Sequence, residues 1–337
     1  MKIFSMFSGI GGFELGIQQA LGKDNVEFIG YSEIDKYAIS IYEKHFNHKN
    51  YGDATKLITT DLQDFDLLVG GFPCQSFSIA GKRKGFNDTR GTLFFEIARV
   101  LRDKRPRYLL LENVKGLLSS NEGKTFQTIL GVLTEIGYQL EWQVLNSKNF
   151  GVPQNRERVF IVGYLGKGSR PKVFPIGGDD EEISREIINK HSSKKWNQVY
   201  RVYDTEGISP TLNTPGGGHH IPKIEQIGNI DRPGNDISNR VFSSNGLSKT
   251  LCGQGGGAEE KTGLYKMGMK IRRLTPTECE RLQGFPDGLT EYGVDEGGND
   301  VKISDTQRYK CLGNAISCPV VEAIFSNLLI KNPQRGT

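Results

Sequence analysis

Two hydrophobic patterns alternate along the first 165 residues. Short apolar runs indicate buried strands, and between them apolar residues recur three and four positions apart, as on one face of a helix. This alternation predicts an α/β domain with a doubly wound, mostly parallel sheet, whose ligands bind at the carboxyl ends of the strands. The predicted strands are Ile3–Phe7, Phe28–Tyr31, Phe65–Val69, Arg107–Leu111, Gln139–Leu145 and Val159–Val162, and the predicted helices are Phe13–Leu21, Lys36–His45, Leu93–Leu101 and Thr125–Ile136.

From about residue 166 to about residue 270 the pattern changes to Gly, Ser, Asn and Pro with short alternating strands. This change predicts a second, smaller domain that is rich in loops and strands. It contains a duplicated segment, residues 201–218 and 240–257, offset by 39 positions. Helical spacing returns at Thr275–Gln283 and Ala315–Leu329, and we expect the last helix to pack back on the first domain. We assign residues 1–165 and 305–337 to the first domain and 166–304 to the second, with an adjoining helix at 273–287.

Composition narrows the class of protein. Hydrophobic residues make up 36% of the chain and charged residues 24%, and no apolar stretch approaches the roughly 18 residues of a membrane span. Five cysteines without paired spacing argue against a disulfide framework and against a zinc site, so we expect a cytoplasmic protein without a metal. The net charge of +4 is compatible with nucleic-acid binding but does not require it. The 42 glycines crowd the first 90 residues and residues 205–270.

A glycine-rich turn follows the first predicted strand, at residues 7–13. Glycines there allow a backbone to approach a nucleotide-like ligand, although the turn alone is a weak signal. Glu33 ends the second strand, where a carboxylate can bind two ribose hydroxyls, and Asp53 follows a little later, where a carboxylate can bind an adenine amino group. The two acids favour an adenosyl ligand over a dinucleotide. The alternative is that they are a helix-capping acid and a turn acid.

A cysteine stands in the sequence Gly-Gly-Phe-Pro-Cys-Gln at residues 70–75, after another predicted strand. A free cysteine is usually a small buried hydrophobe, but the flanking glycines and proline do not suit a packed strand. The interpretation of Cys74 as a nucleophile requires thiolate character, which nearby cations supply. Basic residues follow at 82–84, in a loop that either closes over a substrate or is simply solvated.

Charged residues also stand at the ends of later strands. Glu112 ends an apolar strand and would lie beside Cys74 if the two strands are neighbours; a partly desolvated acid there can hold a proton on a heterocycle nitrogen. The alternative is a helix cap. Arg156 and Arg158 lie two residues apart, on one face of an extended chain, and form either a pair of binding forks or a surface salt bridge.

These motifs and their order resemble those of the bacterial C5-cytosine DNA methyltransferase family, including type II restriction–modification methylases. The Pro-Cys, Glu-Asn-Val (112–114) and Gln-x-Arg-x-Arg (154–158) motifs are followed by residues 273–276, 283–287 and 313–315, all in family order. Each motif is weak alone, but the ordered set is specific. The resemblance covers nearly the whole chain except residues 166–240.

The resemblance implies the fold of class I S-adenosylmethionine-dependent methyltransferases. It implies that Cys74 adds to C6 of a flipped cytosine, that Glu112 stabilises the protonated N3, and that Arg156 and Arg158 orient the base and the acid. Ala315 stands where serine is common and Ile34 where an aromatic often stacks on adenine, so Ile34 is expected to weaken cofactor binding slightly. The residues assigned to S-adenosyl-L-methionine are Phe7, Gly9, Ile10, Gly11, Gly12, Glu33, Ile34, Asp53, Ala54, Pro73, Leu93 and Asn314.

The substrate implied is double-stranded DNA, because a base within a duplex must be flipped out to reach Cys74. The family carries a Thr-Leu dipeptide near the flipped nucleotide, and this chain has two, at 211–212 and 250–251; the second precedes the motif at 273 and is favoured. The residues assigned to DNA are Gln75, Ser78, Lys82, Arg83, Lys84, Arg90, Arg201, Thr211, Arg240, Thr250, Leu251 and Gln254.

The leading hypothesis is a monomeric, site-specific DNA methyltransferase, with a possible cognate restriction endonuclease acting on the same site. A tRNA cytosine-5 methyltransferase with the same motifs is a second hypothesis, disfavoured by the roughly 100-residue glycine-rich domain, which exceeds what its RNA-acting relatives carry. A non-catalytic DNA-binding regulator is a third, disfavoured by the intact motif residues. A nucleotide-dependent oxidoreductase accounts only for the glycine turn.

Overall fold

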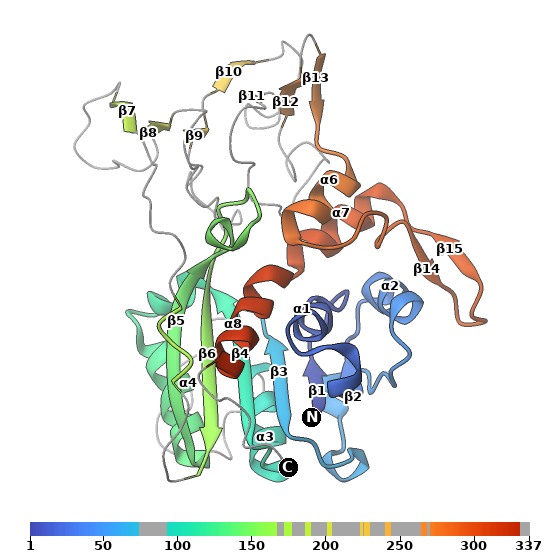
Figure 1. Ribbon diagram of the computed structural model, residues 1–337, viewed down its shortest axis with the longest axis vertical. Helices are drawn as coiled ribbons and strands as arrows, with labels where there is room; N and C mark the ends of the chain where they lie inside the picture. Colours follow the sequence, from blue (N-terminus) through green and yellow to red (C-terminus); the bar gives the residue numbers. More distant parts are fainter. Residues whose placement is uncertain are drawn as a thin grey trace.

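The computed structural model describes residues 1–73, 93–166, 172–176 and 274–328 with their side chains, and the backbone of short strands between 186 and 273 and of residues 329–330. The central sheet has six strands in the order β2-β1-β3-β4-β6-β5 (Figure 1). The predicted α/β fold is confirmed, and every predicted strand of the first domain is present. The strands are β1 (Lys2–Met6), β2 (Glu27–Ser32), β3 (Leu67–Gly71), β4 (Tyr108–Val114), β5 (Tyr138–Asn146) and β6 (Glu157–Leu165).

Strand direction locates the ligand-binding edge of this sheet. Strands β2, β1, β3 and β4 are parallel, whereas β6 runs antiparallel to both β4 and β5. The chain leaves β1 towards β2 and later returns to β3 on the other side of β1, so the strand order reverses between β1 and β3. Ligands of open α/β sheets bind at such a reversal, at the carboxyl ends of the strands.

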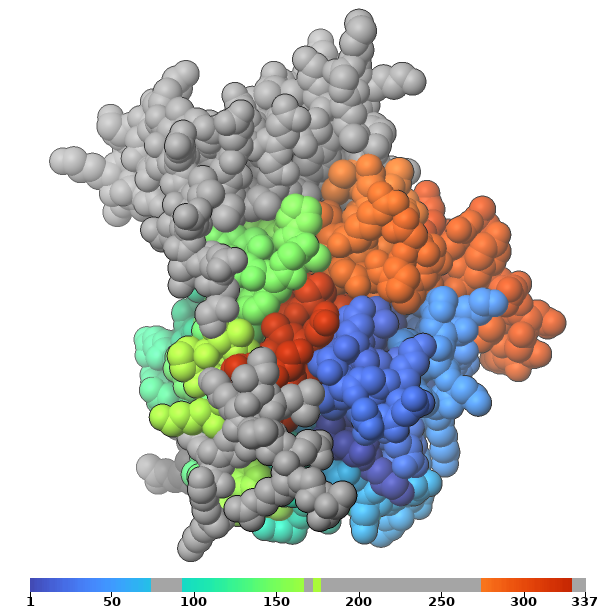
Figure 2. Space-filling model, viewed as in Figure 1, coloured from blue at the N-terminus to red at the C-terminus, as the bar shows by residue number. Residues whose placement is uncertain are grey.

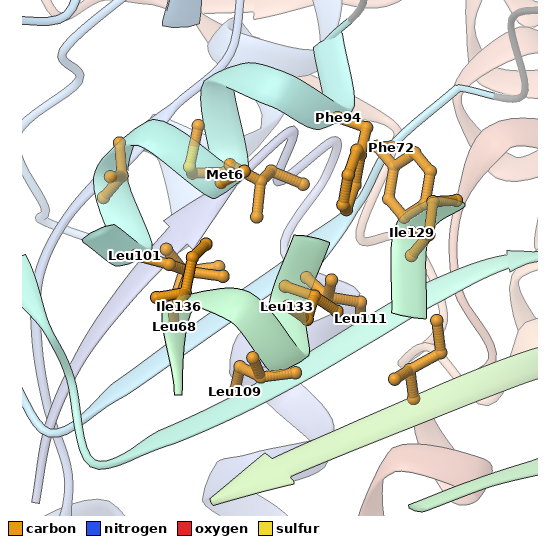
Figure 3. Close-up of a cluster of buried hydrophobic side chains, with 14 of the residues drawn as sticks. Met6, Leu68, Phe72, Phe94, Leu101, Leu109, Leu111, Ile129, Leu133 and Ile136 are labelled. Atoms are coloured by element: carbon orange, nitrogen blue, oxygen red, sulfur yellow. The ribbon is translucent and has the colours of Figure 1, made fainter. Parts of the chain in front are cut away.

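Helices cover both faces of the sheet because its inner strands are apolar on both sides. Leu68 and Leu111 face a core shared with α3 (Leu93–Lys104) and α4 (Lys124–Ile136), shown in Figure 3. Their neighbours Leu67 and Leu110 face the opposite core, which contains residues of α1 (Gly12–Leu21) and α8 (Cys318–Ile330). Runs that are apolar at every position are typical of parallel strands buried on both faces.

The carboxyl-terminal segment returns to the beginning of the chain. It consists of α6 (Pro276–Gln283), the hairpin β14 (Tyr292–Val294) and β15 (Asp300–Lys302), α7 (Asp305–Asn314) and α8. A third core joins Ile10 and Ile41 to Phe285 and Leu312, and Ile41 belongs to α2 (Lys36–His45). Figure 2 shows this segment in orange and red against the blue amino-terminal residues. Helix α8 packs against α1, and it starts at Cys318 rather than at the expected Ala315; α7 and the hairpin were not predicted.

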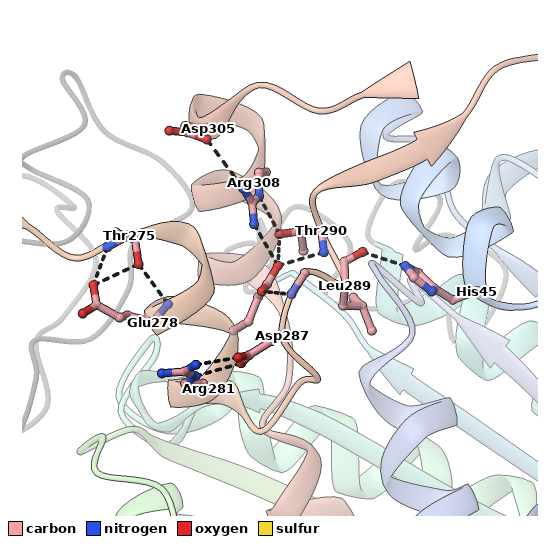
Figure 4. Close-up of polar contacts among 11 residues, drawn as sticks. His45, Thr275, Glu278, Arg281, Asp287, Leu289, Thr290, Asp305 and Arg308 are labelled. Atoms are coloured by element: carbon pink, nitrogen blue, oxygen red, sulfur yellow. Dashed lines mark hydrogen bonds and ion pairs between the residues drawn. The ribbon is translucent and has the colours of Figure 1, made fainter. Parts of the chain in front are cut away.

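A buried ionic network fixes α6 and α7 to the loop between them (Figure 4). The fully buried Glu280 accepts backbone N–H groups of Gly288 (2.6 Å) and Thr290 (2.8 Å), and the Arg308 guanidinium lies 3.2 Å from its carboxylate. A buried charge is tolerated when it is paired and hydrogen-bonded in this way. Thr275 and Glu278 form a capping box at the start of α6, which stabilises its first turn.

The described backbone between residues 186 and 273 contains seven short strands, which form two small sheets. Their bounds are β7 (Glu186–Asn189), β8 (Arg201–Tyr203), β9 (Lys223–Ile224), β10 (Gln226–Asn229), β11 (Arg240–Ser243), β12 (Leu264–Met267) and β13 (Lys270–Arg273). The two copies of the duplicated segment begin with β8 and β11, and each of these strands pairs antiparallel with one neighbour and parallel with the other. The strand that begins each copy therefore has the same pattern of neighbours.

One helical stretch of the described residues, 305–328, has the length and composition of a membrane span. However, 61% of its apolar window is buried inside the fold. It consists of α7 and α8, whose apolar side chains belong to the second and third cores. We therefore interpret it as core helix.

Candidate functional site

The glycine turn between β1 and α1 is held tightly on one side and open on the other. The Phe7 N–H donates to the Ser32 carbonyl at the end of β2 (2.8 Å), and Phe7 itself has a φ of 56°. A side chain on Gly11 would collide with the Phe46 ring, at 2.3 Å. A Cβ on Gly9, where φ is also +56°, would meet nothing within 4 Å. The turn thus leaves its Gly9 side free for a ligand, as a cradle for a nucleotide-like molecule requires.

Glu33 lies beside this open side and is oriented by backbone N–H groups. One carboxylate oxygen accepts the Gly9 N–H (2.9 Å), and the other accepts those of Ile34 (2.8 Å) and Asp35 (2.9 Å). Helix α2 is capped by Asp35 rather than by Glu33, so the capping alternative for Glu33 is wrong. A carboxylate has about four acceptor positions, so these three N–H groups leave about one, on the oxygen that faces Gly9, for a hydroxyl donor. Ile34 is 72% exposed, which gives the same edge an apolar surface for a flat heterocycle.

Asp53 stands at the start of the short 3-10 helix η2 (Ala54–Lys56). One of its carboxylate oxygens accepts the Thr55 backbone N–H (2.9 Å) and hydroxyl (2.8 Å), and these hydrogen bonds hold the pKa of Asp53 below its ordinary value. Asp53 therefore caps a turn, as the alternative interpretation predicted. Capping fixes the direction of the ionised carboxylate.

The register of β3 and β4 brings Glu112 to the strand that leads to Cys74. Gly71 pairs directly with Glu112, and a Cβ on Gly71 would lie 3.3 Å from the Glu112 carboxylate. Arg158, at the start of β6, contacts the same carboxylate at 2.9 Å. The Glu112 and Arg158 side chains are only 12% and 15% exposed. A fixed, largely desolvated acid with a guanidinium beside it suits proton handling on a heterocycle.

Asn113, which the sequence analysis did not single out, holds the end of β3. Its side-chain amide donates to the Phe72 carbonyl (2.9 Å), and its side-chain oxygen accepts the Val114 N–H (2.8 Å). Successive side chains of a strand point to opposite faces of the sheet, so Asn113 and Glu112 lie on opposite faces. Asn113 holds the backbone after β3 from one face, while Glu112 stands on the other. Pro73, the last residue described here, is exposed. Cys74, Gln75, Ser78, Lys82, Arg83, Lys84 and Arg90 lie outside the described residues.

Arg156 has different partners from Arg158. It is 3% exposed and donates to the carbonyls of Gly313 (3.2 Å) and Ala315 (2.8 Å), which flank the exposed Asn314. Arg156 precedes β6, so the alternation of an extended strand, from which a shared face was expected, does not reach it. The interaction brings the end of α7 to the edge of the sheet where Glu112 lies.

Lys310 is a second link that sequence reasoning missed. It donates to the Asp35 carboxylate at 2.5 Å and so joins α7 to the cap of α2. Burial alone would raise the pKa of Asp35, but the hydrogen bonds from Lys310 and from the Ala38 N–H hold it below its ordinary value. The residues after β1 and β2 are therefore enclosed by the carboxyl-terminal segment.

Three of the five cysteines are accounted for by the core. Cys279, Cys311 and Cys318 are buried, and burial raises the pKa of each thiol, for Cys311 to about 12. A nucleophilic thiol requires the opposite, a lowered pKa and access to substrate. Among the described residues, no group of three His, Cys, Asp or Glu side chains is placed to hold a metal ion.

Comparison with known proteins decides the family. Residues 1–329 match the family described as C-5 cytosine-specific DNA methylase. The chain belongs to this family. A DNA (cytosine-5-)-methyltransferase activity follows from the match, and the predicted family and enzyme class are confirmed.

Relatives share this assignment over nearly the full chain. Type II methyltransferase M1.ScrFI of Lactococcus lactis subsp. cremoris is 37% identical over 97% of this chain and 78% of its own length. Type II methyltransferase M.HhaI of Haemophilus parahaemolyticus is 33% identical over 97% of this chain and 94% of its own. The crystal structure of the S. pombe Dnmt2 methyltransferase covers 98% of both chains with a TM-score of 0.62 and 22% identity, which shows the shared fold.

The remaining predicted residues belong to the part of this methyltransferase expected to read DNA. Arg201 and Arg240 begin β8 and β11, at equivalent positions of the two copies. Thr211, Thr250, Leu251 and Gln254 lie outside the described residues.

Of the other predicted cofactor residues, Ile10 and Ala54 are buried, Leu93 begins α3 and is partly exposed, and Gly12 packs against Ile316.

Proposed function

We propose that this methyltransferase transfers the methyl group of S-adenosyl-L-methionine to C5 of a cytosine flipped out of double-stranded DNA, with Cys74 as nucleophile. The observation that carries the proposal is the pairing of Gly71 with Glu112, because Gly71 lies three residues before Cys74 and Glu112 is held by Arg158. The thiolate of Cys74 would therefore act on the same base whose N3 the Glu112 carboxyl reaches.

The roles of the protein groups follow from the chemistry of cytosine, whose C5 is unreactive. Addition of the Cys74 thiolate to C6 pushes an electron pair through the ring, and a proton held by Glu112 at N3 neutralises the charge that develops there. C5 thereby becomes nucleophilic. After methylation, loss of the C5 proton to a base returns the electron pair to the ring, and the C6–S bond breaks to release Cys74. Arg158 keeps Glu112 oriented through this sequence.

The cofactor would be held by the residues at the ends of β1, β2 and β3. The open side of Gly9, the oriented Glu33 carboxylate and the exposed Ile34 surface fit an adenosyl group. Asp53, Leu93 and Asn314 would complete the site. When bound, S-adenosyl-L-methionine supplies the electrophilic methyl group.

We infer that the region from 166 to about 273 recognises the DNA site and that α6 belongs with the catalytic domain. The shared core of α2, α6 and α7 supports this boundary, since Ile41, Cys279 and Leu312 pack together. We further propose that the protein acts as a monomer in the cytoplasm, because one flipped base requires no two-fold symmetry. A restriction endonuclease for the same site would be its natural counterpart, since the curated relatives M1.ScrFI and M.HhaI are type II methyltransferases.

Covalent trapping tests the proposal. Duplex DNA in which 5-fluorocytosine replaces cytosine prevents loss of the C5 substituent, so the enzyme and cofactor should give a denaturation-resistant adduct with the mass of protein plus DNA. Cys74→Ser should give none, whereas Cys252→Ser, which changes the other cysteine beyond the described residues, should react like wild type. An adduct that persists in Cys74→Ser would overturn the nucleophile assignment. An adduct with tRNA but not with DNA would favour the RNA-modifying alternative.

A further inference from the structure

Two basic side chains of helix α3 donate hydrogen bonds to the backbone of the segment that follows Asp53. The Arg99 guanidinium donates to the backbone carbonyls of Ala54 (3.0 Å) and Leu57 (2.8 Å). One turn further along, Lys104 donates to the Leu62 carbonyl (2.9 Å) and contacts the Asp64 carboxylate at 2.6 Å. Both side chains thus bridge from α3 to a segment 42 residues earlier in the chain.

Arg99 is held in place for this contact. Its Nε donates to the Glu96 carboxylate at 2.8 Å, one helical turn before it, and the two side chains are 27% and 22% exposed. A guanidinium is a rigid planar fork, so fixing one edge aims the other. The Ala54 carbonyl also accepts the Leu57 N–H within η2, but at 3.4 Å, so Arg99 supplies its shorter hydrogen bond.

This contact reaches the candidate cofactor site through η2. Asp53 caps η2 with the carboxylate that accepts the Thr55 N–H, so the position of η2 sets the direction of that carboxylate. Ala54, whose carbonyl Arg99 holds, is buried in the core beneath it. Leu93 stands at the start of the same helix, about 9 Å from Arg99 along the axis at about 1.5 Å per residue. Helix α3 therefore supports the adenosyl site from two places.

We propose that Arg99 is a positioning residue for the cofactor: by clamping the Ala54 and Leu57 carbonyls, it fixes the orientation of the Asp53 carboxylate towards the adenine end of the ligand. This inference rests on the cofactor site proposed above. It predicts that Arg99 governs cofactor affinity without touching the cofactor. Lys104 provides the comparison, because it also donates to a backbone carbonyl of this segment, that of Leu62. Leu62 lies nine residues after Asp53, and no residue predicted to bind the cofactor stands next to it.

The test compares Arg99→Met and Lys104→Met in the full chain by calorimetric titration with S-adenosylhomocysteine and by thermal unfolding without ligand. Both variants lose a charged hydrogen-bond donor to backbone carbonyls, so both should unfold at lower temperature than wild type. Only Arg99→Met should bind S-adenosylhomocysteine about tenfold more weakly. This factor corresponds to the loss of about one hydrogen bond's stabilisation from the orientation of Asp53. Lys104→Met should stay within about twofold of wild type, since distant sites act independently. Arg99→Lys, which keeps one donor, should be intermediate and serves where Arg99→Met does not fold.

The results separate this inference from the function on which it depends. Equal affinities for S-adenosylhomocysteine in wild type, Arg99→Met and Arg99→Lys would overturn the positioning role and leave the cofactor site intact. Equal losses in Arg99→Met and Lys104→Met would likewise overturn it, since they would show a general effect of loosening the segment. A wild-type protein that does not bind S-adenosylhomocysteine would overturn the cofactor site itself, and the positioning role with it.

Discussion

Glu14 offers a sharp test of the structure, because it is a carboxyl group with no exposure to solvent. It lies in the first turn of α1, directly after the glycine turn, and the Tyr42 hydroxyl donates to it at 3.1 Å. Burial raises its pKa from the ordinary 4.5 to about 7, against the opposing effect of the hydrogen bond from Tyr42. We predict that Glu14→Gln stabilises the protein at neutral and alkaline pH.

The size of the effect follows from proton linkage. As the pH rises past 4.5, the unfolded chain loses the Glu14 proton while the folded protein keeps it until about pH 7. The unfolded state is therefore favoured progressively across this window, so the stability that Glu14 provides below pH 4.5 is lost by about pH 7. At about 1.36 kcal/mol per pH unit, the loss is about 3 kcal/mol. Glutamine resembles the neutral acid and does not titrate, so Glu14→Gln should escape the loss.

Urea unfolding at a series of pH values between 4 and 8.5 measures this difference. Trp142 lies on β5 in an edge-to-face contact with Phe126, so its fluorescence reports unfolding of the domain that contains Glu14. The chain has one other tryptophan, and Trp196→Phe in every variant leaves Trp142 as the only reporter. Glu27→Gln, at an exposed glutamate on β2, serves as the control and should follow wild type throughout.

The stability of Glu14→Gln relative to wild type should rise by about 3 kcal/mol between pH 4.5 and pH 7.5. Parallel stability curves for the two proteins over this range would refute the reasoning, because they would mean that Glu14 titrates alike in the folded and unfolded chains. A variant that loses stability with rising pH faster than wild type would contradict the sign of the effect.

Three further predictions address the site. Arg158→Met removes the cation 2.9 Å from Glu112, so kcat should fall by about two orders of magnitude while calorimetry shows unchanged affinity for S-adenosylhomocysteine; a changed affinity with normal kcat would contradict the assigned role. Ile34→Ala should weaken that affinity by about tenfold and Ile34→Phe should restore it, with equal melting temperatures because position 34 is exposed; equal affinities would remove Ile34 from the site. Exchanging residues 199–257 for those of a relative should change the methylated sequence and leave kcat within about threefold, whereas an unchanged sequence would place recognition elsewhere.

The sequence predicts the sheet and its edge well because a run of apolar residues indicates a strand that is buried on both faces. The position of Glu112 beside the Cys74 strand followed from two such runs and from the assumption that their strands are neighbours, which the register confirms. The strand itself continues to Val114 rather than ending at Leu111, so Glu112 lies within it. Polar residues do not interrupt a strand when they face a site.

Elements buried through polar contacts escape the same reasoning. Helix α7 was missed because its buried positions include Arg308, paired with Glu280, and Tyr309, whose hydroxyl donates to the Leu274 carbonyl. The two carbonyls to which Arg156 donates lie more than 150 residues away, at the end of that same helix. No local pattern records such contacts, which arise only when the folded chain brings two polar segments together.

Bisulfite sequencing tests the central claim most directly. Plasmid and genomic DNA would be taken from a host without cytosine methylation that expresses this chain or its Cys74→Ala form. The account predicts protected cytosines confined to one short sequence context with the wild-type chain and complete conversion with Cys74→Ala. Complete conversion with soluble, well-expressed wild-type protein, or protection that survives Cys74→Ala, would contradict it.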